Sequence, residues 1–299
     1  MWRTVFVTKG EQISVRDGSL AVKGEDENLI PVEDIYSVII ESIQTSVTVK
    51  AINALTESGA AIVTCDDKHM PCSLTLPLNT HYRSYSVLKA QIEMPEELKA
   101  ALWKKIIRAK IINQAKVLAF SFRNISVREK LFEFADEVTD GDVTNREGLA
   151  AKMFFRELYG SEFIRMADDA INSALNYGYA ILRSAVSKSL VSYGFNCALG
   201  IHHIGEFNPY NLSDDLMEPF RPLVDYWTDI NHLDLLDSLT LENKRGLINL
   251  LNRDVLFDKK KTKVRYAIDL MAKSLASCIE KGGDEYLLLP EIIRIESED

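Results

Sequence analysis

The hydrophobic pattern of this chain changes its period once, between residues 66 and 95, and this change limits the folds that it can adopt. Before residue 66, short runs of β-branched and aromatic residues alternate with turn signals such as Asp17-Gly18. From Glu96 onward, apolar residues recur at helical spacing instead. We therefore predict an α+β fold, in which a β-rich N-terminal domain is followed by a larger all-α C-terminal domain.

Two domains and a linker follow from this pattern. We place the β-rich domain at residues 1–66 and the helical domain at residues 96–299. Residues 67–95 are predicted to be a linker, because aspartate, asparagine and proline interrupt any regular pattern there. One short helix is expected inside the first domain, over residues 49–58, where Gly59 ends it.

Charge is distributed unevenly along the chain, whose net charge is −9. Eight lysines and arginines but one acid lie between residues 103 and 130, whereas nine acids but one arginine lie between 206 and 242. The first segment could hold a polyanion while the second binds metal ions, or both could be solvated helix faces. No run of about 18 apolar residues is present, so we predict no membrane segment and expect a cytoplasmic location.

The first candidate for chemistry is Glu147, at the start of a helix predicted over residues 145–159. Ala151, Phe154 and Leu158 continue its face at helical spacing, so the carboxylate heads a stripe that points inward. A carboxylate in that position must be paired or must bind a cation. A favourable position near the positive end of the helix dipole is the simpler alternative.

A second candidate is a polar stripe on an otherwise apolar helix predicted over residues 162–193. Asn172, Asn176, Tyr179 and Arg183 follow one another at spacings of four, three and four residues. Amides and an arginine along one line suit contacts to a phosphate backbone, or support for a metal site. A satisfied buried network or a solvent-facing stripe is the alternative.

A third candidate is the pair His202 and His203, which lies in a glycine-bounded loop before an acidic helix. On that helix Asp215 and Glu218 are three residues apart and therefore face the same way. An imidazole combined with carboxylates suits Mg²⁺ or Mn²⁺. The loop and helix are thus a candidate divalent-metal site, although structural histidines fit the spacing equally well.

Together, these three segments resemble the CRISPR-associated integrases. Two protein families are universal to spacer acquisition, and the integrases are the catalytic one. The helix at 147–155 is similar to that family's Glu-x-x-Ala-Ala-x-x-(Tyr/Phe)-Phe element, and residues 172–179 match its Asn-x-x-Leu-x-Tyr-Gly-Tyr element. Residues 200–203 and 215–222 match its Gly-x-x-His element and its Asp-Leu-Met-Glu-x-Phe-Arg-Pro helix. The resemblance covers nearly the whole chain, and members from type II systems look most similar.

The resemblance implies that the helical domain is catalytic, and that Glu147, His203 and Glu218 are its catalytic residues and the ligands of Mg²⁺ or Mn²⁺. His203 is preferred to His202 because it closes the Gly-x-x-His element. Asp215 matches an acidic position that contributes to the metal site in some members. Pro219 departs from the pattern, because relatives often have a second acid there.

The activity that the resemblance implies is that of a metal-dependent DNA endonuclease and integrase of CRISPR adaptation. Such an enzyme inserts short DNA spacers into the repeat array, where a 3′-hydroxyl attacks a phosphodiester. Two alternatives remain open. One is a non-catalytic DNA-binding scaffold. The other is a metal-dependent nucleotide phosphohydrolase, for which the chain lacks a glycine-rich phosphate loop.

The partners that the resemblance implies are DNA and proteins. We expect a homodimer, formed through the β-rich domain. Two such dimers would join one dimer of the second universal adaptation protein in a heterohexamer, and type II accessory and effector proteins are further candidates.

Candidate DNA contacts lie on the basic segment and on the polar stripe. Their side chains could hold backbone phosphates without reading the base sequence. These candidates are Lys104, Lys105, Arg108, Lys110, Asn172, Asn176 and Arg183. A second basic cluster at residues 259–265 could add positive charge, or could be a solvated loop.

Overall fold

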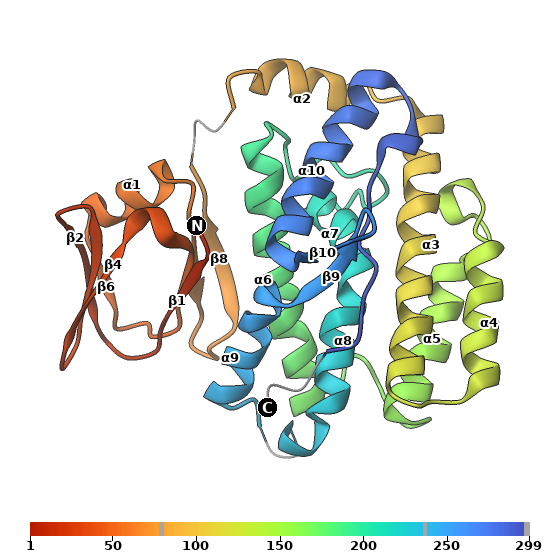
Figure 1. Cartoon of the computed structure of the whole chain (residues 1–299), viewed down its shortest axis with the longest axis horizontal. Helices are drawn as coiled ribbons and strands as arrows, with labels where there is room; N and C mark the ends of the chain where they lie inside the picture. Colours follow the sequence, from red (N-terminus) through yellow and green to blue (C-terminus); the bar gives the residue numbers. More distant parts are fainter. Residues whose placement is uncertain (78–80, 236–237, 296–299) are drawn as a thin grey trace. The chain divides into compact units, whose positions relative to one another are not determined.

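The structure, a computed structural model, describes residues 1–77, 81–235 and 238–295 of the chain. The chain divides into two compact units, Met1–Tyr82 and Arg83–Asp299 (Figure 1). The first unit is rich in strands and the second consists mainly of helices. The predicted α+β class, with a β-rich part followed by a larger helical part, is therefore confirmed.

The first unit contains two four-stranded sheets. In one, β1, β5 and β7 are parallel and β8 is antiparallel to β7; in the other, β2 lies between β3 and β6. The strands are β1 (Arg3–Val7), β2 (Gln12–Arg16), β3 (Ser19–Lys23), β4 (Glu27–Pro31), β5 (Ile35–Ile40), β6 (Ser46–Val47), β7 (Ala61–Cys65) and β8 (Pro71–Thr75). Asp17 and Gly18 form the predicted two-residue turn between β2 and β3, and both have positive φ angles.

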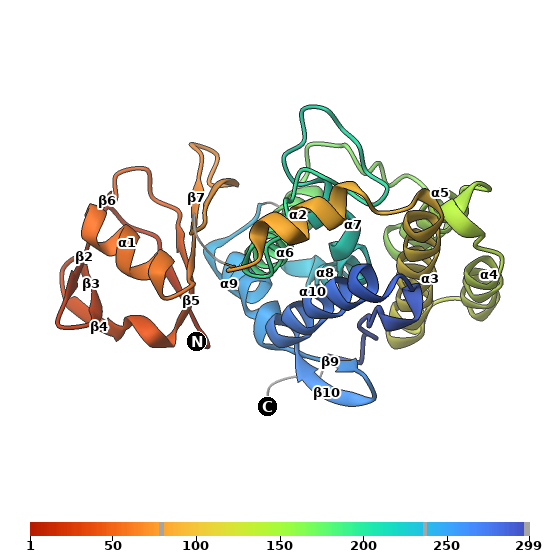
Figure 2. The ribbon, with the colours of Figure 1, turned by 90° about the horizontal axis from the view of Figure 1, so that it is seen from above.

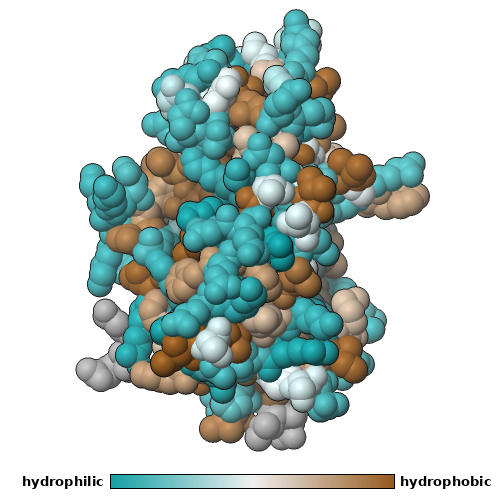
Figure 3. All heavy atoms as spheres, turned by 90° about the vertical axis from the view of Figure 1, so that its right-hand side faces the viewer, coloured by the Kyte–Doolittle hydropathy of each residue, from teal (hydrophilic) through white to brown (hydrophobic). Residues whose placement is uncertain are grey.

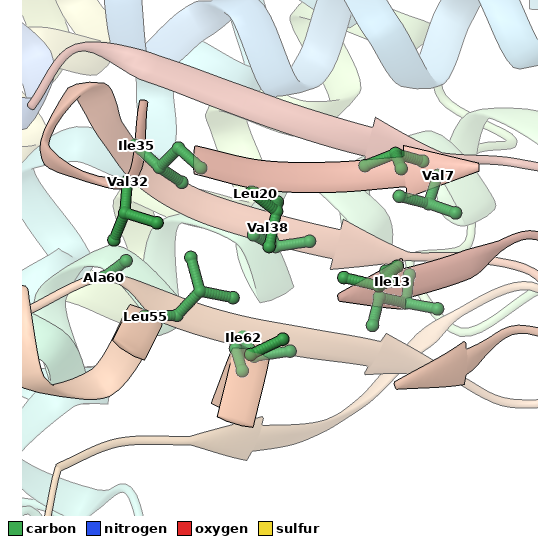
Figure 4. Close-up of a cluster of buried hydrophobic side chains, with 12 residues drawn as sticks. Val7, Ile13, Leu20, Val32, Ile35, Val38, Leu55, Ala60 and Ile62 are labelled. Atoms are coloured by element: carbon green, nitrogen blue, oxygen red, sulfur yellow. The ribbon is translucent and has the colours of Figure 1, made fainter. Parts of the chain in front are cut away.

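The core of the first unit lies between its sheets and one helix. Ile13 and Leu20 come from one sheet, Val38 comes from the other, and Leu55 comes from α1 (Val49–Glu57), the helix predicted over 49–58 (Figure 4). Every residue of β5 is buried, which explains why this strand is a nearly continuous apolar run without alternation.

The predicted linker at 67–95 contains regular structure, so this prediction is wrong. Strand β8 pairs with β7, and helix α2 (Ser84–Ile92) belongs to the second unit. Pairing with β7 fixes β8 although Thr75 is its only β-branched residue, and Pro71 stands at the first position, where a missing N–H is tolerated. Residues 78–80 of the predicted linker lie outside the described residues.

The second unit is built around α3 (Glu96–Phe120), which is buried on more than one side. Leu102, Ile106, Ile107 and Ile111 are fully buried. Figures 1 and 2 show α4 and α5 on one side of α3 and α8 on the other. The remaining helices are α4 (Ile125–Asp136), α5 (Arg146–Tyr159), α6 (Ala170–Ser192), α7 (Asn211–Met217), α8 (Arg221–Ile230), α9 (Leu241–Asn249) and α10 (Val264–Lys281).

Short 3₁₀ turns and one hairpin complete the second unit. The hairpin of β9 (Asp254–Phe257) and β10 (Lys260–Lys263) corrects the all-α prediction at the basic cluster of residues 259–265. The 3₁₀ turns are η1 (Val32–Asp34) in the first unit and η2 (Asp140–Asp142), η3 (Glu218–Phe220), η4 (His232–Leu235), η5 (Leu250–Asn252) and η6 (Asp284–Tyr286) in the second.

The surface on one face of the molecule is mixed in polarity. On the face shown in Figure 3, hydrophilic residues predominate and hydrophobic ones are scattered among them. Within residues 1–77, 81–235 and 238–295, no helix has the length and the apolar composition that crossing a membrane requires.

A close contact between α6 and α8 gives a first prediction. A Cβ atom added at Gly178 would lie 2.5 Å from Cγ1 of Val224, whose β-branched side chain has little freedom to move away. We expect Gly178→Ala to lower the free energy of unfolding by about 1–3 kcal/mol, because overpacking outweighs the better helix propensity of alanine. Urea unfolding measures this loss, with the exposed position Lys152→Ala as the control. An unchanged or higher midpoint would contradict the prediction.

Candidate active site

The predicted site residues lie along one face of α3. The ring of Trp103 stacks on that of His202, with ring centroids 4.1 Å apart, and meets the ring of His203 edge-on at 5.6 Å. Lys110 is seven residues further along α3, which is two helical turns and therefore the same face. Its ammonium contacts two predicted site residues, Glu147 and Glu218. The helix α3 thus connects the histidine loop with the glutamates.

Glu147 and Glu218 share one cation. Glu147 lies in the first turn of α5, where Asp142 accepts a hydrogen bond from its backbone N–H. Its Oε1 accepts a hydrogen bond of 2.6 Å from Nζ of Lys110. The same nitrogen lies 2.5 Å from Oε2 of Glu218, which begins η3 and is 1% exposed. Two carboxylates from different helices therefore converge on one positively charged group.

Arg221 holds the second oxygen of Glu218. Its guanidinium donates a hydrogen bond of 2.7 Å to Oε1 of Glu218 and lies 4.2 Å above the ring of Tyr179. The hydroxyl of Tyr179 in turn donates a hydrogen bond to Asp225. Burial by itself would raise the pKa of Glu218, but Arg221 and Lys110 outweigh it and lower this pKa to about 2. Glu218 is therefore held as an ionised carboxylate.

Asp215 organises the histidine loop. Its carboxylate is completely buried; Oδ2 accepts hydrogen bonds from the backbone N–H groups of Ile201 (2.5 Å) and His202 (3.0 Å). Its Oδ1 accepts hydrogen bonds from the backbone N–H of His203 (3.1 Å) and from the ring Nδ1 of His203 (2.6 Å). These four bonds use the full acceptor capacity of a carboxylate. The predicted contribution of Asp215 as a metal ligand thus does not fit this geometry, because its oxygens are taken by the loop.

The same bonds fix how His203 presents its ring. Because Nδ1 faces a carboxylate, it carries the proton, and Nε2 keeps its lone pair in the neutral ring. The hydrogen bond with Asp215 raises the pKa of His203 above its usual 6.5, and Glu218 contributes to this rise. Gly200 is required beside this loop, because an added Cβ would lie 2.2 Å from the carbonyl oxygen of His203.

The predicted ligand triad is brought together only in part. Glu147 and Glu218 contact one ammonium, and the pKa of His203 responds to the charge of Glu218. In the part of the chain that the structure describes, however, no three histidine, cysteine or acidic side chains are grouped closely enough to hold a metal ion. A metal centre at Glu147, His203 and Glu218 therefore stays a prediction.

The structure corrects one predicted DNA contact. Lys110 is buried between the glutamates, so it does not present its charge on the surface of α3. The other basic candidates each have a partner within the second unit. Lys104 pairs with Asp140 (3.0 Å), Lys105 donates to the carbonyl oxygen of Asp284 (2.7 Å), Arg108 pairs with Asp136 (2.9 Å) and Arg183 pairs with Asp214 (2.6 Å).

The side chains of the polar stripe of α6 have partners within the second unit. The helix begins at Ala170, later than predicted, because Asp169 caps it by accepting a hydrogen bond from the N–H of Asn172. Asn172 is buried and, like Asn176, accepts a hydrogen bond from the guanidinium of Arg165. The stripe thus combines both alternatives: Asn172 and Tyr179 are buried with partners, whereas Asn176 is exposed.

Sequence reasoning missed two residues of this site, Trp103 and Arg221. The position of Arg221, three residues after Glu218, is itself a signal, because residues at this spacing are neighbours on a helix. No comparable signal marks Trp103, since a tryptophan in an apolar helix is ordinarily a core residue.

Known proteins similar to this chain point to one family. Residues 5–230 match the model of a family described as CRISPR associated protein Cas1. A CRISPR-associated endonuclease Cas1 from Neisseria meningitidis is 37% identical over 300 residues, which are 99% of this chain and 98% of that relative.

Solved structures share the fold of this chain. One is a casposase bound to integration product, with a TM-score of 0.78 and 20% identity, covering 99% of this chain and 96% of that one. Another is a Cas6-RT-Cas1–Cas2 complex, with a TM-score of 0.75 and 20% identity over 98% of this chain and 36% of that one. At this identity the likeness concerns the fold alone.

Proposed function

Because the chain belongs to the CRISPR-associated Cas1 family, we propose that it is a divalent-metal-dependent DNA endonuclease and integrase of CRISPR adaptation. It inserts short DNA spacers into the repeat array. The 3′-hydroxyl of a spacer attacks a phosphodiester at the repeat boundary, and the bond to the leaving 3′-oxygen breaks. One phosphodiester replaces another in this transesterification, without a covalent enzyme intermediate.

The observation that carries this proposal is the convergence of Glu147 and Glu218 on one cation, beside an oriented imidazole. Carboxylate oxygens and the Nε2 of a neutral histidine are ligands that suit Mg²⁺ or Mn²⁺. The side chain of Glu147 is 28% exposed and that of His203 is 41% exposed, so both face a region that solvent reaches. The donor atoms therefore suit a divalent ion held by Glu147, His203 and Glu218, which would draw together three side chains that are not grouped around one point in the described residues.

Such an ion, when bound, would polarise the scissile phosphate and lower the pKa of the attacking hydroxyl. The surrounding residues would orient its ligands. Asp215 keeps the proton of His203 on Nδ1, and Arg221 fixes one oxygen of Glu218. Trp103 limits the rotation of both histidine rings through its stacked and edge-on contacts.

The partners proposed are DNA and the second universal adaptation protein. The fold likeness to the Cas6-RT-Cas1–Cas2 complex supports a Cas2-type partner, and the likeness to the casposase supports strand transfer on DNA. We propose two homodimers, each joined through the β-rich unit and bridged by one partner dimer in the cytoplasm of a type II system.

Glu147→Gln tests this function while it keeps the volume of the side chain and one oxygen that can still accept a hydrogen bond from Lys110. We expect Mn²⁺-dependent strand joining to fall by more than about 100-fold, beyond the loss typical of residues that only orient a metal ligand. DNA affinity should stay unchanged. Joining is measured with a labelled spacer and a repeat-bearing plasmid in the presence of the partner protein.

The matched control is Glu129→Gln, the same chemical change at an exposed position of α4. Unchanged joining by Glu147→Gln would exclude the proposed metal site. A wild-type protein that binds DNA but joins no strands under any divalent ion would favour the scaffold alternative.

A further inference from the structure

Lys110 occupies the position where the proposed function requires a metal ion. It is 6% exposed, and its Nζ lies 2.6 Å from Glu147 and 2.5 Å from Glu218. An ammonium and a divalent ion both need the negative oxygens that these two residues supply. The two cations therefore compete for the same oxygens.

The formal charges of the four side chains in direct contact are balanced. Lys110 and Arg221 carry two positive charges, Glu147 and Glu218 carry two negative charges, and the buried Asp225 lies beyond Tyr179. Each oxygen of Glu218 faces one of the two cations. A divalent ion added beside these two cations would bring further positive charge into a largely buried space in which both oxygens of Glu218 are already occupied, which is strongly unfavourable. One resident cation must leave before a metal ion can bind.

Lys110 is the cation that can leave. The guanidinium of Arg221 is planar, packs 4.2 Å above the ring of Tyr179 and comes from a backbone position only three residues from Glu218. The ammonium of Lys110 is a point charge on a flexible four-carbon stem. It also touches Glu147, which is the more exposed of the two glutamates, so it can withdraw toward solvent on that side.

We propose that Lys110 is an internal counter-ion that closes the metal site and is displaced when a divalent ion binds. This inference rests on the proposed function, since it requires a metal ion at Glu147 and Glu218. The ammonium prevents other cations from binding the two glutamates, and it preserves the arrangement of the glutamates in the metal-free protein. The affinity of the site for a metal ion is therefore lower than it would be for the same carboxylates without Lys110.

Lys110→Met tests the competition directly, because methionine keeps an unbranched stem but carries no charge. We expect Mn²⁺ to bind the full-length variant roughly tenfold more tightly than the wild-type protein, a typical coupling between two ligands. Isothermal titration of the DNA-free protein with MnCl₂ measures this affinity. Lys99→Met is the matched control, because it removes an ion pair with Glu96 from the same helix and should leave Mn²⁺ affinity unchanged.

A second measurement uses the wild-type protein, so it does not depend on the variant folding. An amine-acylating reagent should modify Lys110 faster when Mg²⁺ is added, because the displaced ammonium becomes accessible, whereas modification of Lys99 should not change. Peptide mass spectrometry follows both sites.

The outcomes of these two experiments distinguish a failure of the inference from a failure of the proposed function. Tighter Mn²⁺ binding by Lys110→Met, or metal-stimulated labelling of Lys110, supports the inference. If the wild-type protein binds Mn²⁺ but Lys110→Met binds it no more tightly and the labelling of Lys110 does not rise, the inference is overturned and the metal site stands. If neither protein binds Mn²⁺, the proposed function itself fails, and the inference fails with it.

Discussion

Glu218→Ala should lower the free energy of unfolding of the metal-free protein by about 3–5 kcal/mol, the usual cost of removing one partner of a buried ion pair. The carboxylate is 1% exposed, and Lys110 and Arg221 both depend on it. Its removal leaves two cations in a largely buried space with one carboxylate between them. Strand joining should be abolished as well, because the deeper of the two converging carboxylates is lost. Urea unfolding in the presence of a chelator measures the stability.

The pH dependence of stability provides an independent check on the same residue. The pKa of Glu218 is lowered from 4.5 to about 2 in the folded protein, because Arg221 and Lys110 outweigh the opposite effect of burial. A carboxyl group with a lowered pKa stabilises the fold fully above its unfolded pKa, and this contribution is lost as the pH falls toward the folded value. The wild-type protein should therefore lose stability more steeply than Glu218→Gln between about pH 4.5 and 2.

Glu218→Gln is also the control for shape, because it keeps the volume of the side chain and one acceptor oxygen. It should be less destabilised than Glu218→Ala but equally inactive in strand joining. A Glu218→Ala protein as stable as the wild type would show that these ion pairs do not contribute to folding stability.

The fold could be predicted from the sequence wherever the hydrophobic period was strong. The change from strand-like runs to helical spacing located both units, and Asp17-Gly18 located a hairpin. The strands β8 and β10 could not be predicted in this way, because they have few apolar residues and depend on pairing with β7 and β9. Pairing partners far along the chain are not visible in a local pattern.

The site could be predicted from the sequence only where the spacing of residues along a helix determines the direction of a side chain. The inward-facing stripe of α5 led to the prediction that the carboxylate of Glu147 has a partner, and that partner is Lys110. The sequence around Lys110 is basic and therefore suggested a surface contact to DNA. Its burial results from the packing of α5 and η3 against α3, which no local pattern encodes. In the same way, Asp215 shares a helix face with Glu218, but its oxygens are used by backbone N–H groups of a loop more than ten residues away.

Asp215→Ala should lower the free energy of unfolding by about 2–4 kcal/mol, because several buried N–H donors lose their acceptor at once and each orphaned donor costs about 1–3 kcal/mol. Water molecules that enter the vacated space would accept hydrogen bonds from some of these donors. Strand joining should fall by about 10–100-fold or more, the range expected when a residue that orients a metal ligand is removed. Urea unfolding and the joining assay give both values.

Asp215→Asn separates the orientation of His203 from simple packing. The asparagine amide keeps one acceptor oxygen, but its NH₂ group faces backbone donors and cannot accept from them. Because the hydrogen bond with Asp215 is what chiefly raises the pKa of His203, this pKa should fall in the variant. Titration of the histidine ring by NMR in metal-free protein follows the change. Asp214→Asn is the neighbouring control and should lower the pKa less, since Asp214 acts on His203 only at a distance. An unchanged pKa in Asp215→Asn, together with unchanged joining, would show that Asp215 supports the loop backbone and has no part in presenting His203.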